Sequence, residues 1–256
     1  MTHRASRQRD TVHWLVLALL LLVMLPTPAS TEGTPVVSST DTDWPMYRGN
    51  PARTGDMPGP GIDGQPVELW RIEVGGQINS APAVVNGTVY FGAGNGDVYA
   101  VDTETGDVIW LFNIGNPISS APAVADGVVY VGSNDGTLYA LDAATGTEQW
   151  TLPGTRPDAS VAIVDGIVYS GSADGYLYAI DAATGEEQWR AELGDAASRS
   201  SAVADGIVYI GSADGVLHSF DATTGERGWA FQTEGGGVLA TPTISKGMVF
   251  QATFDS

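Results

Sequence analysis

Three charged residues are the strongest candidates for a binding site in this 256-residue chain. Arg156 and Arg199 stand where comparable segments carry small or uncharged residues, and Asp158 lies beside Arg156. Two guanidinium groups and a carboxylate form a polar patch suited to a carboxylate ligand or to a peptide from a protein partner. An exposed Arg–Asp pair contributes at most about 1 kcal/mol, so solvated loop charges are the alternative interpretation.

Groups for catalysis or metal binding are scarce. The chain has no cysteine, which excludes disulfides, thiolate metal sites and a lipid-bearing cysteine. Beyond residue 29 the single histidine is His218, and no Ser-His-Asp arrangement can be assembled around it. The segment "GSNDG" at 132–136 lacks the alternating carboxylates of a calcium loop. We therefore predict no catalytic, metal-binding or cofactor-binding residue from the residue types alone.

The elements that must position the charged patch repeat with a period near 40. Tryptophans recur at spacings of 40, 40, 39 and 40 residues, at Trp70, Trp110, Trp150, Trp189 and Trp229. Within each period, short apolar runs are joined by Asn-Gly or Asp-Gly pairs, which suit type I′ hairpin turns because both central residues need a positive φ. Four antiparallel strands repeated about every 40 residues predict an all-β fold, a β-propeller with four-stranded blades. A flat solenoid is disfavoured, because its coils repeat every 20 to 30 residues or so.

The same period divides the chain into blades. A first strand is expected at 67–74, and the blades are expected at 71–110, 111–150, 151–189 and 190–229, with a partial one at 230–256. A closed eight-blade ring needs roughly 320 residues, so about 4.5 blades of such a ring are present and the sequence is expected to be truncated or an open fragment. Ligands of propellers usually bind in the funnel formed by the loops that precede the innermost strands. Arg156, Asp158 and Arg199 fall in such loops, so the charged patch is expected at the mouth of this funnel.

The N-terminal residues are expected to be a targeting signal. Three arginines precede an apolar run from Trp14 to Leu25, which as a helix would be about 18 Å long, too short for a bilayer core of about 30 Å. We expect a signal peptide at 1–29, or an uncleaved anchor as the alternative. A linker and lead-in segment at 30–65 and propeller repeats at 66–256 follow. The protein is therefore expected outside the cytoplasm, in the periplasm or secreted.

The net charge excludes one class of partner. The formal charge of −19 repels phosphate backbones and anionic lipids. Nucleic acid is therefore not an expected partner, and membrane contact is expected only through the N-terminal segment if it stays uncleaved.

Four segments share one motif: Asp in the third position, Thr-Gly in the sixth and seventh, and Trp in the eleventh. They lie at 100–110, 140–150, 179–189 and 219–229. The motif resembles the tryptophan-docking motif of the PQQ-type propellers, the family of quinoprotein alcohol dehydrogenases and of the BamB class. The resemblance implies structural docking between blades, through Asp102, Trp110, Asp142, Trp150, Asp181, Trp189, Asp221 and Trp229.

The resemblance leaves three classes of function open. Since catalytic groups are scarce, the leading hypothesis is an exported, non-enzymatic scaffold without a cofactor, which binds a protein partner in the cell envelope or extracellular space. Strand addition at an exposed edge is one such binding mode. The alternative is a dehydrogenase, or a fragment of one, with PQQ and calcium as cofactors; many members also use adjacent cysteines, which this chain lacks. A further alternative is an extracellular sensor of a ligand or glycan.

Overall fold

The computed structural model describes a chain built from β-strands. The described residues are 43–56, 65–155, 159–197, 199–234, 236–238 and 240–253. They lie in one compact unit, Ser38–Ser256. Within these ranges the strands form four four-stranded antiparallel sheets and one two-stranded sheet, and no helix could span a membrane. The predicted all-β architecture of four-stranded blades is confirmed.

In each four-stranded sheet every strand pairs with its neighbour in sequence. The first blade contains β1 (Ala83–Val85), β2 (Thr88–Gly92), β3 (Asp97–Asp102) and β4 (Val108–Asn113). The second contains β5 (Ala123–Ala125), β6 (Val128–Gly132), β7 (Thr137–Asp142) and β8 (Glu148–Pro153). The third contains β9 (Ala162–Val164), β10 (Ile167–Gly171), β11 (Tyr176–Asp181) and β12 (Glu187–Glu192). The fourth contains β13 (Ala202–Ala204), β14 (Ile207–Gly211), β15 (Val216–Asp221) and β16 (Arg227–Gln232), and a fifth sheet starts with β17 (Thr243–Ser245) and β18 (Met248–Phe250).

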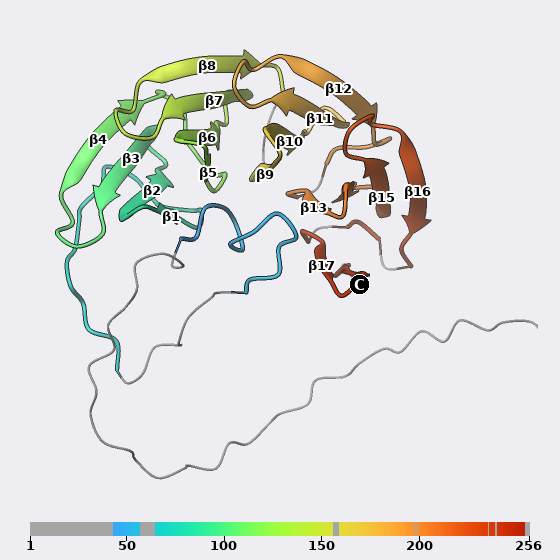
Figure 1. Ribbon diagram of the computed structural model, residues 1–256, viewed down its shortest axis with the longest axis horizontal. Coiled ribbons are helices and arrows are strands. Elements are labelled where there is room, and N and C mark those ends of the chain that lie inside the picture. The colour runs from blue at the N-terminus through green and yellow to red at the C-terminus, as the bar shows by residue number, and fades with distance from the viewer. Residues whose placement is uncertain are drawn as a thin grey trace, which may run out of the picture. The chain divides into compact units, whose positions relative to one another are not determined.

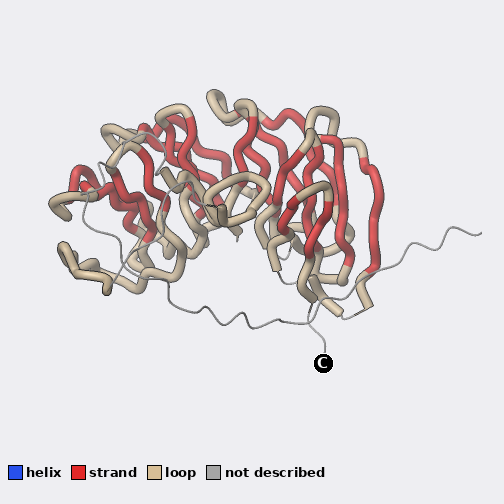
Figure 2. Tube along the Cα trace, turned by 60° about the horizontal axis from the view of Figure 1, so that its bottom comes forward, coloured by secondary structure: helices blue, strands red, loops and turns tan. Residues whose placement is uncertain are grey.

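The blades fan out around a common centre (Figure 1). The short strands β1, β5, β9 and β13 face the centre, and the longer strands β4, β8, β12 and β16 form the rim. Figure 2 shows the four sheets side by side, with loops gathered at their ends. The described blades make an arc rather than a closed ring, as expected for part of a propeller. Apolar side chains between neighbouring blades, such as Leu138, Val168 and Ile180, form the core.

The hairpin turns follow two geometries. Between the first two strands of each blade both turn residues take a positive φ, as Asp126 (49°) and Gly127 (77°) do, in agreement with a type I′ turn. Between the second and third strands the same prediction is wrong, because only the glycine has a positive φ. There the Asp135 carboxylate accepts a hydrogen bond from the amide of Thr137 at 2.8 Å. This hydrogen bond to the side chain stabilises the turn without the positive φ that a type I′ turn would require at Asp135.

The segment 67–74, which was predicted to be a strand, is not one. In the described structure no neighbouring strand pairs with it. Trp70 nevertheless docks on the first blade: its Nε1 donates to the carbonyl of Thr103 at 2.8 Å, and its ring lies against Gly106. The segment therefore takes the outer position of a preceding blade without the hydrogen bonds of a strand.

The repeated tryptophans join each blade to the next. The indole Nε1 donates to a backbone carbonyl of the following blade, in the pairs Trp110 and Ala143 (2.9 Å), Trp150 and Ala182 (3.0 Å), and Trp189 and Ala222 (3.1 Å). Each ring also covers the motif glycine of that blade. A Cβ on Gly185, whose φ is 75°, would approach the Trp150 ring to 2.7 Å. The motif therefore needs glycine for both the backbone angle and the space.

The motif aspartates hold the turns on which the tryptophans dock. Asp142 Oδ1 accepts hydrogen bonds from the amides of Ala144 and Thr145 and from the Thr145 hydroxyl. The bonds from Thr145 hold the pKa of the Asp142 carboxyl below its usual value. Because hydrogen-bond donors stabilise the ionised carboxylate more than the neutral acid, the turn favours the charged form.

His218 in β15 takes the place that a tyrosine holds in the other blades. There Tyr178, for example, donates its hydroxyl proton to Asp174 at 2.6 Å. His218 is 2% exposed; its Nε2 lies 3.0 Å from Ser212 Oγ, and the Ser212 hydroxyl hydrogen-bonds Asp214. Arg227 contacts the other ring nitrogen. Since arginine only donates, His218 must be neutral, with its proton on Nε2.

This buried histidine predicts a loss of stability in mild acid. Burial and the nearby Arg227 lower the pKa of His218 from 6.5 to about 4. Between these values the unfolded chain takes up a proton that the folded chain does not, so the free energy of unfolding falls as the pH falls. From pH 7 to pH 5 we expect wild type to lose about 2 kcal/mol more than His218→Tyr, which copies the other blades, in urea unfolding. Equal losses in the two proteins would contradict this role.

Candidate functional site

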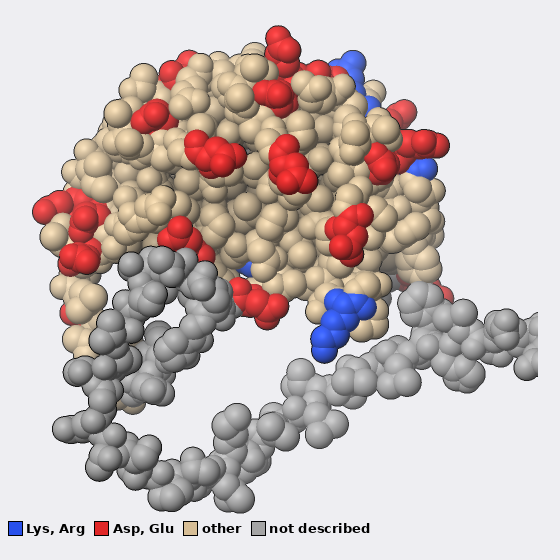
Figure 3. Space-filling model, viewed as in Figure 1, with Lys and Arg blue, Asp and Glu red and all other residues tan. Residues whose placement is uncertain are grey.

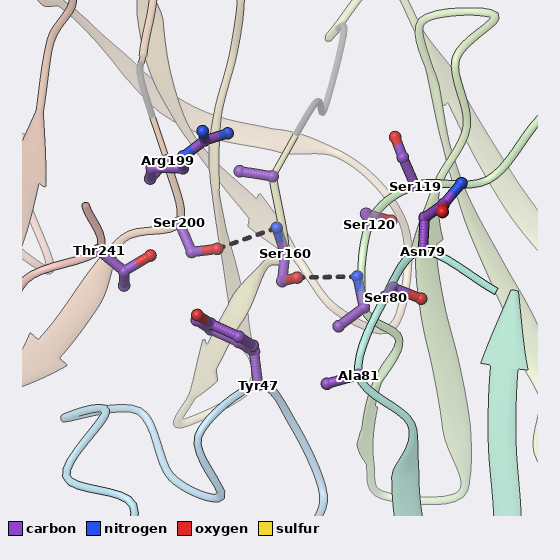
Figure 4. A pocket seen from close by; sticks show the side chains of 12 residues that line it. Tyr47, Asn79, Ser80, Ala81, Ser119, Ser120, Ser160, Arg199, Ser200 and Thr241 are labelled. Carbon is purple, nitrogen blue, oxygen red and sulfur yellow. Dashed lines mark hydrogen bonds between the residues drawn. The ribbon is translucent and has the colours of Figure 1, made fainter. Parts of the chain in front are cut away.

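A pocket of about 260 Å³ lies at the centre of the blades. The loops that lead into β1, β5, β9, β13 and β17 all contribute to it. Most of its polar groups are hydroxyls, from Ser80, Ser119, Ser120, Ser160, Ser200 and Thr241. Asn79 and Arg199 add an amide and a guanidinium group (Figure 4). The sequence showed these serines only as small residues in the loops, so their common role as a pocket wall was missed.

Two of these hydroxyls join neighbouring blades along the pocket wall. Ser160 Oγ accepts a hydrogen bond from the amide of Ala121 at 2.8 Å, and Ser200 Oγ accepts one from the amide of Ser160 at 3.0 Å (Figure 4). Both serines stand two residues before the innermost strand of their blades. The wall is therefore held in place by hydrogen bonds from blade to blade, which favours a preformed site.

Among the described residues that line the pocket, one buried hydroxyl has no hydrogen-bond partner. Ser120 Oγ bonds both the amide and the carbonyl of Gly132, at 2.9 and 2.8 Å. Ser80 stands at the corresponding position of the first blade, and its buried Oγ is unpartnered. An unsatisfied buried hydroxyl costs about 1–3 kcal/mol, so a polar ligand atom that reached Ser80 would be favoured.

The floor of the pocket comes from the lead-in segment, residues 43–56. Its Tyr47 side chain closes the pocket from below in Figure 4. The segment crosses the inner ends of the blades from β1 to β17 (Figure 1). Backbone hydrogen bonds fix it to four sheets: Trp44 with Val84 (2.6 and 2.8 Å), Pro45 with Val124 (2.7 Å), Pro51 with Val203 (2.9 Å) and Ala52 with Ile244 (2.9 Å).

Arg53 anchors this segment to the third and fourth blades. Its guanidinium group is fully buried, and donates to the carbonyls of Ser201 (3.0 Å), Val161 (2.9 Å) and Tyr47 (2.6 Å). Burial lowers its pKa to about 9, so the group stays charged at neutral pH. The sequence offered one weak signal, a single arginine between proline and glycine in "NPARTG", and the residue was missed.

The structure places one member of the predicted funnel patch at the pocket. Arg199 is exposed at the rim, on the side opposite Asn79 and Ser119 (Figure 4). Arg156 and Asp158 lie outside the described residues, so the patch as a whole stays a prediction.

The described lining suits a ligand that accepts hydrogen bonds. It offers hydroxyl, amide and guanidinium groups and no carboxylate. A carboxylate could accept hydrogen bonds from Arg199 and from the hydroxyls of Ser160 and Ser200, whose oxygens accept from backbone amides and whose protons can still be donated. Calcium prefers carboxylate oxygens, so these residues do not fit a calcium ion. Among the described residues, no group of three or more acidic or histidine side chains could hold a metal.

The surface around the blades is acidic. Aspartate and glutamate side chains are spread over the face in Figure 3, and lysine and arginine are few there. With a formal charge of −19, the chain repels highly anionic ligands at long range. The pocket therefore suits a single carboxylate on an otherwise neutral or basic molecule.

Comparisons with known proteins agree with the observed fold. The family model described as outer membrane protein assembly factor BamB matches residues 64–202 and 173–256. The comparison with curated proteins finds no match.

Three solved structures illustrate the likeness. BamB from Moraxella catarrhalis is 24% identical, with a TM-score of 0.64 over 71% of this chain and 57% of that one. The quinohemoprotein alcohol dehydrogenase from Comamonas testosteroni is 21% identical, with a TM-score of 0.67 over 82% and 45% of the two chains. The computationally designed Ika8 protein is 25% identical, with a TM-score of 0.61 over 66% and 54%. This chain thus spans about half the length of these structures, and the likeness to the two natural proteins concerns the fold alone.

Proposed function

This chain belongs to the PQQ-type propeller family whose model is described as outer membrane protein assembly factor BamB, and from this membership we propose that it is an exported, non-enzymatic scaffold that binds a protein partner. The location outside the cytoplasm is part of the proposal. It rests on the basic and apolar signal-like segment at 1–29, which lies outside the described residues.

The observation that carries the proposal is the central pocket. Its volume of about 260 Å³ is below the range of roughly 300–1,000 Å³ that is typical of small-molecule sites. A pocket of this size suits the end of a polypeptide or one side chain of a partner better than a large cofactor. Arg199, the serine hydroxyls and the unpartnered Ser80 together favour a carboxylate, so we propose that the pocket holds a carboxylate of the partner.

A minimal carboxylate ligand tests the pocket. We expect N-acetyl-alanyl-alanine to shift the NMR signals of Arg199 and the pocket serines, and the same compound with a C-terminal amide to bind about tenfold more weakly. Arg199→Ala should weaken binding of the acid by about tenfold, because a hydrogen bond to a charged group contributes about 1.5–3 kcal/mol. Arg71→Ala, on the exposed surface, is the control and should change nothing. Equal affinity for the acid and the amide would rule out the carboxylate.

The family also contains dehydrogenases, and a titration with PQQ and Ca²⁺ separates the two classes. For a scaffold we expect neither saturable binding nor dye-linked oxidation of alcohols. The absence of carboxylates from the described pocket lining supports this expectation. Saturable PQQ binding together with alcohol oxidation would overturn the scaffold proposal.

A further inference from the structure

The outer strand of the first blade exposes an unusual set of apolar side chains. In β4, Val108, Ile109 and Leu111 are 45%, 50% and 49% exposed. The strand lies at the rim of the propeller (Figure 1), away from the central pocket. It pairs with β3 on one side only, so its other side is an edge of the sheet.

None of the other complete blades carries large apolar residues at these positions, and the second and third blades carry polar ones. The residues that match Val108, Ile109 and Leu111 are Glu148, Gln149 and Thr151 in β8, and Glu187, Gln188 and Arg190 in β12, whereas β16 carries Arg227 and the small residues Gly228 and Ala230. The six residues of β8 and β12 are exposed to solvent. A complete neighbouring blade precedes each of these two blades, so a preceding blade does not cover these positions. The positions therefore face solvent even between neighbouring blades, and their apolar character distinguishes β4 from β8 and β12.

The edge of β4 has the properties of a surface for strand addition. A β-strand at a sheet edge presents unpaired N–H and C=O groups that an extended polypeptide can complete. Ile109 and Leu111 are two residues apart and so lie on one face of the strand, where alternate side chains of an added strand would meet them. Trp110 between them is turned to the next blade, on which it docks.

The charge near this edge indicates which kind of strand fits. The turn that leads into β4 carries Asp102, Glu104 and Asp107 and no basic residue. In the view of Figures 1 and 3, acidic side chains gather at this turn. The other end of β4 leads into the uncharged segment 113–116. An added strand is therefore favoured when its lysines or arginines lie at the end that meets the turn.

We propose that β4 binds an extended segment of a protein partner, with alternating apolar side chains and a basic end at the 102–107 turn. Because the other pairs of neighbouring strands in the sheet are antiparallel, the added strand runs antiparallel to β4 and its basic end is its C-terminus. This surface is separate from the central pocket, so either site can fail while the other holds.

A peptide of this chemistry tests the proposal. The probe is fluorescein-labelled Thr-Val-Thr-Ile-Thr-Val-Lys-Lys, and its binding is measured by fluorescence anisotropy. The combined variant Val108→Glu, Ile109→Gln and Leu111→Thr copies β8 and should weaken binding at least tenfold. Replacing both lysines of the peptide by glutamates should have a similar effect. On the wild type, the bound peptide should slow amide hydrogen exchange in β4.

The chain also offers a gain-of-function variant. Transplanting the apolar residues onto the second blade, with Glu148→Val, Gln149→Ile and Thr151→Leu, should add a second binding site, weaker than the first because the 142–147 turn carries a single acid. Arg199→Ala should leave peptide binding unchanged, which separates this result from the test of the pocket. Equal binding to wild type and to the β8-like variant would overturn the proposal. So would sedimentation showing that wild type self-associates and the variant does not, because a second copy would then be the occupant.

Discussion

Arg53→Met is expected to lower the free energy of unfolding by about 3 kcal/mol. Methionine fills a similar volume but donates nothing, so the carbonyls of Ser201, Val161 and Tyr47 lose their partner. Each unsatisfied buried carbonyl destabilises the folded state by about 1–3 kcal/mol. Methionine also avoids the desolvation energy of a buried charge, and this gain offsets part of the loss. Urea unfolding at pH 7 measures the difference.

Two other variants isolate the cause of this loss. Arg71→Met removes an arginine that is 75% exposed and paired with Glu68, and should change the stability by about 0.5 kcal/mol or less. Arg53→Lys keeps the charge without the planar fork and should give an intermediate stability. If Arg53→Met were no more destabilising than Arg71→Met, Arg53 would not anchor the lead-in segment.

Trp150→Ala is expected to lower the free energy of unfolding by about 3–5 kcal/mol, the usual range for deleting a large aromatic side chain from a packed site. The ring fills the space above Gly185 and donates to the carbonyl of Ala182 at 3.0 Å. Its loss would leave a cavity between the second and third blades and remove one of the two hydrogen bonds that the carbonyl of Ala182 accepts, the other coming from the Tyr130 hydroxyl. Chemical unfolding, or the melting temperature, reports the change.

Trp229 provides the matched control. Within its own blade its ring lies 5.9 Å from that of Tyr209, much as Trp150 lies 5.8 Å from Tyr130. Trp229 is, however, 43% exposed. We therefore expect Trp229→Ala to cost about 1 kcal/mol, so that the difference between the two variants measures docking on the next blade. Similar losses would show that contacts within one blade account for the effect.

The blades could be predicted because each copy repeats the same local requirements. Tryptophans near every 40 residues and Asp-Gly pairs mark backbone positions that recur, and repetition separates them from chance. The turn after the second strand was misjudged, because Asp135 uses its side chain where a positive φ was expected. An Asp-Gly pair alone does not distinguish a type I′ turn from a turn in which the aspartate side chain accepts a backbone hydrogen bond.

The pocket was much harder to predict than the blades. Arg199 was singled out because it departs from the repeat, and it lines the pocket. Tyr47 and Arg53 were missed because the lead-in segment has no sister copy to compare, and the partners of Arg53 in the blades lie more than 100 residues away in the sequence. Periodicity reveals what is repeated, whereas this site is built where a unique segment meets the repeats.

The path of the lead-in segment also sets the order in which the molecule can be completed during synthesis. Each blade is built from neighbours in sequence and can form as soon as its own residues leave the ribosome. The lead-in segment emerges before all of them, yet Arg48 bonds Thr243, 195 residues later. Trp44 and Pro45 can pair with the first two blades early, but the part of the segment from Arg48 to Arg53 must wait until the later strands exist. Attachment of this part is therefore a slow step that depends on contacts distant in sequence.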